Sequence, residues 1–341
     1  MRFILATAFT ALTAVSYAQN DSSSFFLQKG LEEKGKGRTL EAYKQFDKAY
    51  SYNKANKEVV NELANSLLSL RRYAQAREKF LELEKLGDKS ADTYKQLMTL
   101  SFNMRQYPDA IKYAGLVKQA NPAEKVAFYV GKAHYDNENY GEAIKQLNVA
   151  MQEDPSNAEA PYMIARAFAD MNNFKQATPY FEKAIALQPD NARWMYELGL
   201  IYYAIPDDKN SLKYLLMAGE KGLKRDNEYL ENLAIAYLNN KQYDKGMDIL
   251  KESLSRRPSD MNLLGMMAEA SYDAKKYDDA IGYWDQVLTL DKQNASALYM
   301  IGMSYQKKGD KQKGQALCDK AIQMDPSLSK NRQKVEMPGG L

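Results

Sequence analysis

The chain has 341 residues, of which 45% are hydrophobic and 27% are charged. This composition excludes a disordered chain and a protein embedded throughout in a membrane. Because 47 basic residues are nearly balanced by 44 acidic ones, the net charge of +3 gives no general attraction to nucleic acid, and no nucleic-acid partner is expected.

Residues 1–18 have the features of a secretory signal peptide. An apolar run follows Arg2, and the small residues Ser16 and Ala18 precede a cleavage point between Ala18 and Gln19. The run is too short to span a bilayer, and no cysteine follows the cleavage point to carry a lipid anchor. We therefore expect an extracytoplasmic protein, periplasmic or secreted, with no membrane insertion after cleavage. The alternative is that these residues form an N-terminal helix of the fold.

A period of about 34 residues organises the rest of the chain. Residues 124–157 and 158–191 align without a gap, and small residues at the eighth and twentieth positions coincide. Self-similarity at this spacing is typical of arrays of helical hairpins. Extending the frame gives a linker at 19–22, nine repeats and a polar tail at 329–341. The nine repeats are 23–56, 57–90, 91–123, 124–157, 158–191, 192–226, 227–260, 261–294 and 295–328.

Recurring residue types assign roles to positions of the repeat. The twentieth position is small in every repeat, and Met98 is the one exception at the eighth, so two helices should approach closely there. The seventeenth is aromatic in six of the nine repeats. A proline closes five of the nine, where it would stop a helix. In repeat 6, Pro206 predicts a distorted turn between the two helices.

These positions resemble the pattern of the tetratricopeptide repeat (TPR) family over residues 23–328. The resemblance implies an all-α fold, a right-handed superhelical solenoid of about nine antiparallel helix pairs. It also implies that the first helix of each repeat lines a concave groove that binds a protein or peptide partner.

Three features that suggest chemistry have simpler explanations. The stretch "GLEEKGKG" (30–37) comes close to a phosphate-binding loop, but Gly37 replaces the Ser or Thr that would bind magnesium. The single histidine, His134, stands where other repeats have tyrosine, and one histidine excludes histidine clusters and triads. The single cysteine, Cys318, stands where other repeats have Phe or Trp and should be a small buried side chain. We therefore expect no catalytic residues, no metal site and no cofactor.

The groove positions implied by the resemblance provide a candidate partner site. In repeats 3 to 6 they are rich in aromatic and basic residues, which would suit a partner segment with acidic and apolar side chains. Repeats 7 and 8 contribute an acidic stretch instead: Glu228, Glu231, Glu269, Tyr272 and Asp273. The candidate site comprises Lys95, Phe102, Lys125, Phe128, Lys132, Tyr135, Tyr162, Arg166, Arg193, Tyr196 and Tyr203. The alternative is that these tyrosines pack between neighbouring helices.

The sequence thus predicts an exported, non-catalytic scaffold for protein–protein interaction, within an envelope-associated complex. One alternative is a structural solenoid that self-assembles into a homo-oligomer. Another is a protein that binds or acts on cell-wall glycan through carboxylates and tyrosines.

Overall fold

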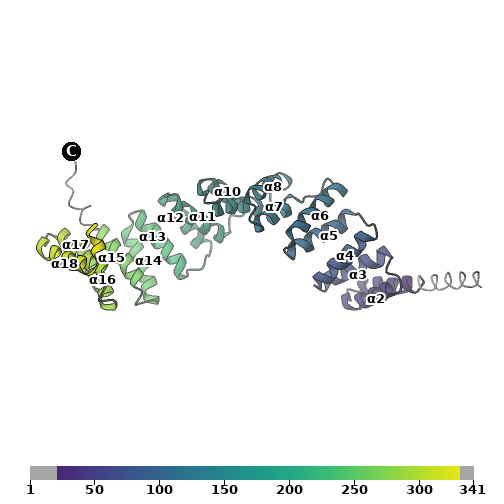
Figure 1. Ribbon diagram of the computed structural model, residues 1–341, viewed down its shortest axis with the longest axis horizontal. Helices are drawn as coiled ribbons and strands as arrows, with labels where there is room; N and C mark the ends of the chain where they lie inside the picture. Colours follow the sequence, from purple (N-terminus) through teal and green to yellow (C-terminus); the bar gives the residue numbers. More distant parts are fainter. Residues whose placement is uncertain (1–20, 331–341) are drawn as a thin grey trace, which may run out of the picture. The chain divides into compact units, whose positions relative to one another are not determined.

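The computed structural model describes residues 21–330, so the expected signal peptide and most of the polar tail lie outside the described residues. These residues fall into two compact halves, which meet in sequence after Met171. Within the described part of the chain, every regular element is an α-helix except one 3-10 turn at Pro326–Leu328. The prediction of an all-α fold built from antiparallel helix pairs is confirmed (Figure 1).

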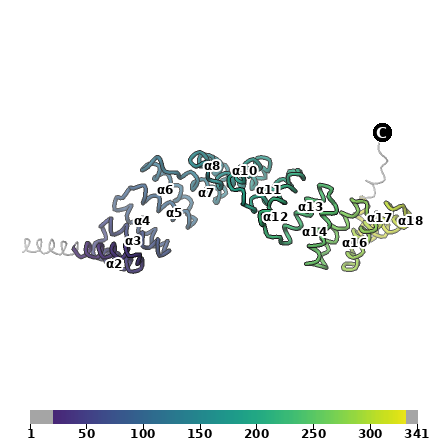
Figure 2. Tube along the Cα trace, turned by 180° about the vertical axis from the view of Figure 1, so that it is seen from behind, coloured from purple at the N-terminus to yellow at the C-terminus, as the bar shows by residue number. Residues whose placement is uncertain are grey.

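The N-terminal half (21–171) begins with a helical stretch at 21–35. The helices that follow are α2 (Thr39–Tyr52), α3 (Lys57–Ser69), α4 (Tyr73–Lys85), α5 (Ala91–Asn103), α6 (Tyr107–Ala120), α7 (Ala127–Asp136), α8 (Tyr140–Glu153) and α9 (Glu159–Asp170). Helices that are consecutive in the sequence pack side by side in this half, as the trace in Figure 2 shows.

The C-terminal half (172–330) repeats this arrangement. Its helices are α10 (Phe174–Leu187), α11 (Ala192–Ala204), α12 (Asp208–Glu220), α13 (Asn227–Asn239), α14 (Tyr243–Arg256), α15 (Met261–Asp273), α16 (Tyr277–Leu290), α17 (Ala295–Lys308) and α18 (Lys311–Met324). No helix in residues 21–330 is both long and apolar enough to cross a bilayer.

Side-chain caps fix the starts of several helices. The Asn56 side chain accepts hydrogen bonds from the backbone N–H groups of Glu58 and Val59, and the Asp260 carboxylate does the same at the start of α15. Such caps satisfy N–H groups that have no partner inside the helix, and each stabilises its helix by about 1 kcal/mol.

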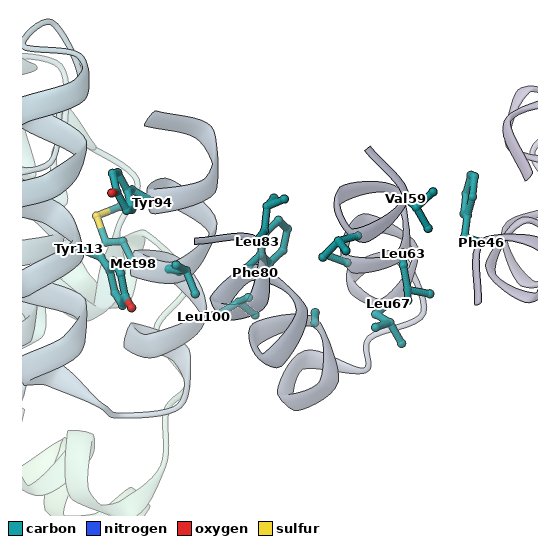
Figure 3. Close-up of a cluster of buried hydrophobic side chains, with 14 of the residues drawn as sticks. Phe46, Val59, Leu63, Leu67, Phe80, Leu83, Tyr94, Met98, Leu100 and Tyr113 are labelled. Carbon is teal, nitrogen blue, oxygen red and sulfur yellow. The ribbon is translucent and has the colours of Figure 1, made fainter. Parts of the chain in front are cut away.

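Large apolar side chains fill the space between successive helices of the N-terminal half. Phe46 and Phe80 are fully buried and alternate along the chain with Leu63 and Leu97 from the intervening helices. Figure 3 shows Phe46, Leu63 and Phe80 in the spaces between these helices. Burying each such side chain contributes roughly 1.5–3 kcal/mol, which explains how repeats without disulfides hold together.

The small residues at the eighth position are required by close contact with the second helix. A Cβ atom added at Gly30 would lie 2.3 Å from the Phe46 ring, and one at Gly131 would lie 2.6 Å from Leu147. In both pairs the second residue lies sixteen positions further on. At Met98, the residue at that spacing is Ala114, and both side chains are buried. The exception is therefore a volume-conserving exchange of large and small side chains.

The same packing accounts for Cys318. It is 3% exposed, and a Cβ atom at Gly302 would lie 2.7 Å from its sulfur, so the thiol fills the place of a core side chain. His134 is half-buried on α7.

All the turns between the two helices of a repeat in residues 21–330 share one left-handed residue. Its φ is 57° at Arg71 and Arg105, 61° at Lys275 and 102° at Gly309. Pro206 occupies this place in repeat 6 with a φ of 23°, the local distortion that its sequence predicts. Only the first and last of these turns use glycine, so most of them carry a conformational cost.

Exchanging residues at this turn position should change stability in opposite directions. Lys275→Gly keeps the left-handed conformation and removes its steric cost of about 1–2 kcal/mol. The greater freedom of glycine in the unfolded chain offsets about 0.5–1 kcal/mol of this gain. We expect a gain of up to about 1 kcal/mol, whereas Gly309→Ala should lose about 1 kcal/mol. Urea unfolding followed by circular dichroism measures both, and equal effects of the same sign would contradict the shared turn geometry.

Candidate functional site

The predicted groove residues are divided between the two halves of the chain. Eight lie on α5, α7 and α9 or just before α7, and the remaining three lie on α11. The first helices of neighbouring repeats contact each other. For example, the ring centroids of Phe102 on α5 and Tyr129 on α7 are 6.2 Å apart. The Tyr135 hydroxyl on α7 donates to Asp170 at the end of α9 at 2.7 Å.

An aromatic and basic surface lies between α5 and α7. The rings of Phe128 and Tyr129 meet edge to face at 6.1 Å, and the Lys132 ammonium lies 6.0 Å from the centroid of the Phe102 ring. Tyr129 is 37% exposed, and Lys125, four residues earlier in the sequence, is also exposed. We call Phe102, Lys125, Phe128, Tyr129 and Lys132 the basic–aromatic patch.

Tyr129 was missing from the residues expected from the sequence. It occupies the sixth position of repeat 4, which is one of the groove positions that the family resemblance implies. Its position in the repeat could therefore have identified Tyr129 as a groove residue. In the structure its ring contacts both Phe102 and Phe128.

Other predicted residues of the N-terminal half are engaged within the fold. Burial raises the pKa of the Tyr135 hydroxyl, and its hydrogen bond to Asp170 raises that pKa further. The Arg166 guanidinium donates to the Tyr162 hydroxyl at 3.2 Å on the same helix. Lys95 forms an exposed ion pair with Glu124 at 2.8 Å. The alternative of packing between neighbouring helices therefore describes Tyr135 better than a free contact surface does.

On α11 the structure separates the three predicted residues. Tyr196 is 3% exposed; its hydroxyl donates to Glu228 at 2.9 Å and accepts from Asn232 at 2.7 Å. Its ring is thus part of the core, which differs from the expected surface role. The Arg193 side chain lies above that ring and donates to Glu197 at 2.9 Å.

Tyr203, by contrast, is 51% exposed and lines an open pocket of about 300 Å³ with residues of α13, α14 and α15. The acidic stretch predicted in repeats 7 and 8 is also divided. Glu228 accepts from Tyr196, Glu231 pairs with Arg257, and the side chains of Glu269 and Asp273 line the pocket.

The described residues contain no group of three or more His, Cys, Asp or Glu side chains placed to hold a metal ion. The surfaces outlined above are suited to contact with other molecules through aromatic, apolar and charged side chains.

Each half is a stack of helical hairpins whose first helices adjoin, which is the architecture of an α-solenoid repeat protein. Models of the tetratricopeptide repeat match residues 27–91 and 162–222, and a further one matches 295–328. The family described as "Anaphase-promoting complex, cyclosome, subunit 3" matches 103–184 and 208–287. The chain is a tetratricopeptide repeat protein.

Several curated proteins are similar to parts of the chain. "Cytochrome c-type biogenesis protein CycH" of Pseudomonas aeruginosa is 28% identical over 37% of this chain and 32% of its own length. "BBSome complex member BBS4 homolog" of Drosophila melanogaster is 21% identical over 89% of this chain and 65% of its own length. The chain thus spans between about a third and two thirds of these two relatives. "Type IV pilus assembly protein PilF" of Pseudomonas aeruginosa is 25% identical over 54% of this chain and 73% of its own length.

Among solved structures, the C-terminal part of a TPR repeat-containing protein from Cytophaga hutchinsonii superposes with a TM-score of 0.54 at 21% identity. It covers 70% of this chain and 98% of its own. This likeness supports the fold.

Proposed function

We propose that the chain is an exported, non-catalytic scaffold that binds a segment of a partner protein on the basic–aromatic patch, within an envelope-associated complex. The observation that carries the proposal is the ring contact of Phe102, Tyr129 and Phe128, in which Tyr129 is exposed and the Lys132 ammonium lies beside the Phe102 ring. Aromatic rings offer a large contact area with few rotatable bonds, and the lysines favour a partner with acidic side chains.

Two further observations support the setting. Residues 1–18 have the charge and apolar pattern of a signal peptide. Two similar proteins have names that refer to biogenesis and to pilus assembly, which are processes that bring proteins together. Fold-level likeness alone would not assign a function, so the weight rests on the patch.

The test is crosslinking mass spectrometry in intact cells, with wild type compared to Lys125→Glu/Lys132→Glu. We expect crosslinks between one dominant partner and α5 or α7 to fall at least tenfold in the variant, because reversed charges repel acidic side chains. The protein recovered from the same cells should begin at Gln19. A matched control, Lys112→Glu/Lys145→Glu, makes the same charge change on exposed positions of α6 and α8.

Circular dichroism should first show that both variants keep the helicity of the wild type. An unchanged partner set in Lys125→Glu/Lys132→Glu would overturn the patch as the binding surface. Crosslinks between copies of this chain that disappear in the variant would instead favour self-assembly.

A further inference from the structure

The pocket of the C-terminal half combines three kinds of side chain. The rings of Tyr203 and Tyr243 belong to its lining, and Ile235 and Met266 contribute apolar surface. The Glu269 and Asp273 carboxylates complete it from α15. Because these two residues are four apart on one helix, they face the same side.

No cation neutralises the two carboxylates within the described part of the chain. Neither takes part in any ion pair found among residues 21–330. No lysine lines the pocket; Lys276 pairs with Asp244 at 2.8 Å, and the Lys245 ammonium lies over the Tyr237 ring. Two like charges thus share one pocket without neutralisation.

The pKa of Glu269 reflects this setting. Partial burial raises it above its usual value, and the negative charge of Asp273 raises it further. A bound cation would remove the repulsion between the two carboxylates and would favour their charged forms.

We propose that this pocket receives an arginine side chain from a partner segment. The aliphatic stem would lie on Ile235 and Met266, and the planar guanidinium would contact the tyrosine rings while donating to Glu269 and Asp273. Arginine fits better than lysine because its guanidinium both stacks on aromatic faces and forms paired hydrogen bonds with carboxylates. The volume of about 300 Å³ can admit one long side chain.

This inference rests on the proposed role as a scaffold for protein partners and adds a chemical preference to it. The basic–aromatic patch would select acidic and apolar side chains, whereas the pocket would select arginine. The two surfaces lie in different halves of the chain, so each can be tested while the other is left intact.

The experiment is NMR of the full chain labelled at methionine methyl groups, with Met266 assigned through Met266→Leu. The probes are Nα-acetyl-arginine amide and Nα-acetyl-citrulline amide, which has nearly the same shape without the charge. We expect the Met266 methyl signal to shift saturably with the arginine probe and at least tenfold more weakly with the citrulline probe. Glu269→Gln/Asp273→Asn should weaken arginine binding at least tenfold.

A matched variant, Asp285→Asn/Glu220→Gln, removes two exposed carboxylates of α16 and α12 outside the pocket and should bind the arginine probe as the wild type does. Equal shifts with both probes, or unchanged binding in Glu269→Gln/Asp273→Asn, would overturn the inference. Equal affinity for Nα-acetyl-lysine amide would contradict the choice of arginine. Because this assay uses no cellular partner, its failure differs from failure of the crosslinking test.

Discussion

Gly314→Ala is expected to loosen the packing of α18 on α17 and to destabilise this hairpin by about 2 kcal/mol. An added Cβ atom would lie 2.5 Å from the Gly302 carbonyl oxygen and 2.8 Å from the Gln306 backbone nitrogen. Backbone atoms cannot rotate away as a side chain can, so the two helices must separate. The gain of about 0.5–1 kcal/mol from removing a helical glycine is too small to offset this cost.

Hydrogen exchange followed by mass spectrometry measures the effect locally, which suits a repeat array whose ends open separately. Amides of α17 and α18 should exchange about 30-fold faster in Gly314→Ala, since each 1.4 kcal/mol corresponds to a factor of ten.

Gly282→Ala is the control for this prediction. Nothing lies within 4 Å of a Cβ atom at Gly282 in α16, so alanine should slow exchange there through its better helix propensity. If both variants protect their helices equally, the close approach at the twentieth position does not limit packing.

The helix pairs could be predicted from the sequence because the constraint on each is local. A small side chain at Gly131 is needed by Leu147, only sixteen residues further on, and contacts at the same spacing recur in other repeats. Because the contact recurs with the period of the repeat, it can be recognised in the sequence. The shared left-handed turn was not readable, because Arg71, Lys275 and others hold it without the usual glycine.

The candidate site was less predictable, because its residues depend on contacts between repeats. Tyr196 and Tyr203 both stand at positions of the repeat that should face the groove. The sequence does not show that the Tyr196 ring is buried against Tyr229 whereas the Tyr203 ring is exposed. The difference depends on the first helix of the following repeat, α13. Its Glu228 and Asn232 side chains form hydrogen bonds with the Tyr196 hydroxyl. The pocket likewise combines side chains of four helices, and no single repeat carries its pattern.

Raising the pH from 9 to 12 is expected to unfold both halves, because buried tyrosines lose their protons only at the expense of the fold. Burial, together with hydrogen bonds to carboxylates, raises the pKa of Tyr113, Tyr196 and Tyr214 to about 12. Their carboxylate partners are Glu84, Glu228 and Glu182, respectively.

A raised pKa in the folded state gives stability that is complete below the unfolded value near 10 and is lost as the pH rises toward 12. Each of these tyrosines, which are at most 7% exposed, would account for roughly 2 kcal/mol of the loss. Absorbance at 295 nm reports tyrosinate, and circular dichroism at 222 nm reports helix. We expect exposed tyrosines such as Tyr73 to ionise near pH 10 with the helices intact, and a second ionisation step to coincide with helix loss.

Lysine deprotonation also begins in this range, so a variant is needed to isolate the tyrosines. Tyr214→Phe keeps the ring and removes the titrating hydroxyl, which with Tyr202 donates to Glu182. Its stability at pH 9 should fall by about 1–2 kcal/mol through the lost hydrogen bond to a charged group, but the further loss between pH 9 and 12 should be smaller than in the wild type. Urea unfolding at both pH values gives that difference. An equal loss in Tyr214→Phe and wild type would show that lysines, rather than the tyrosine–carboxylate pairs between repeats, set the alkaline limit.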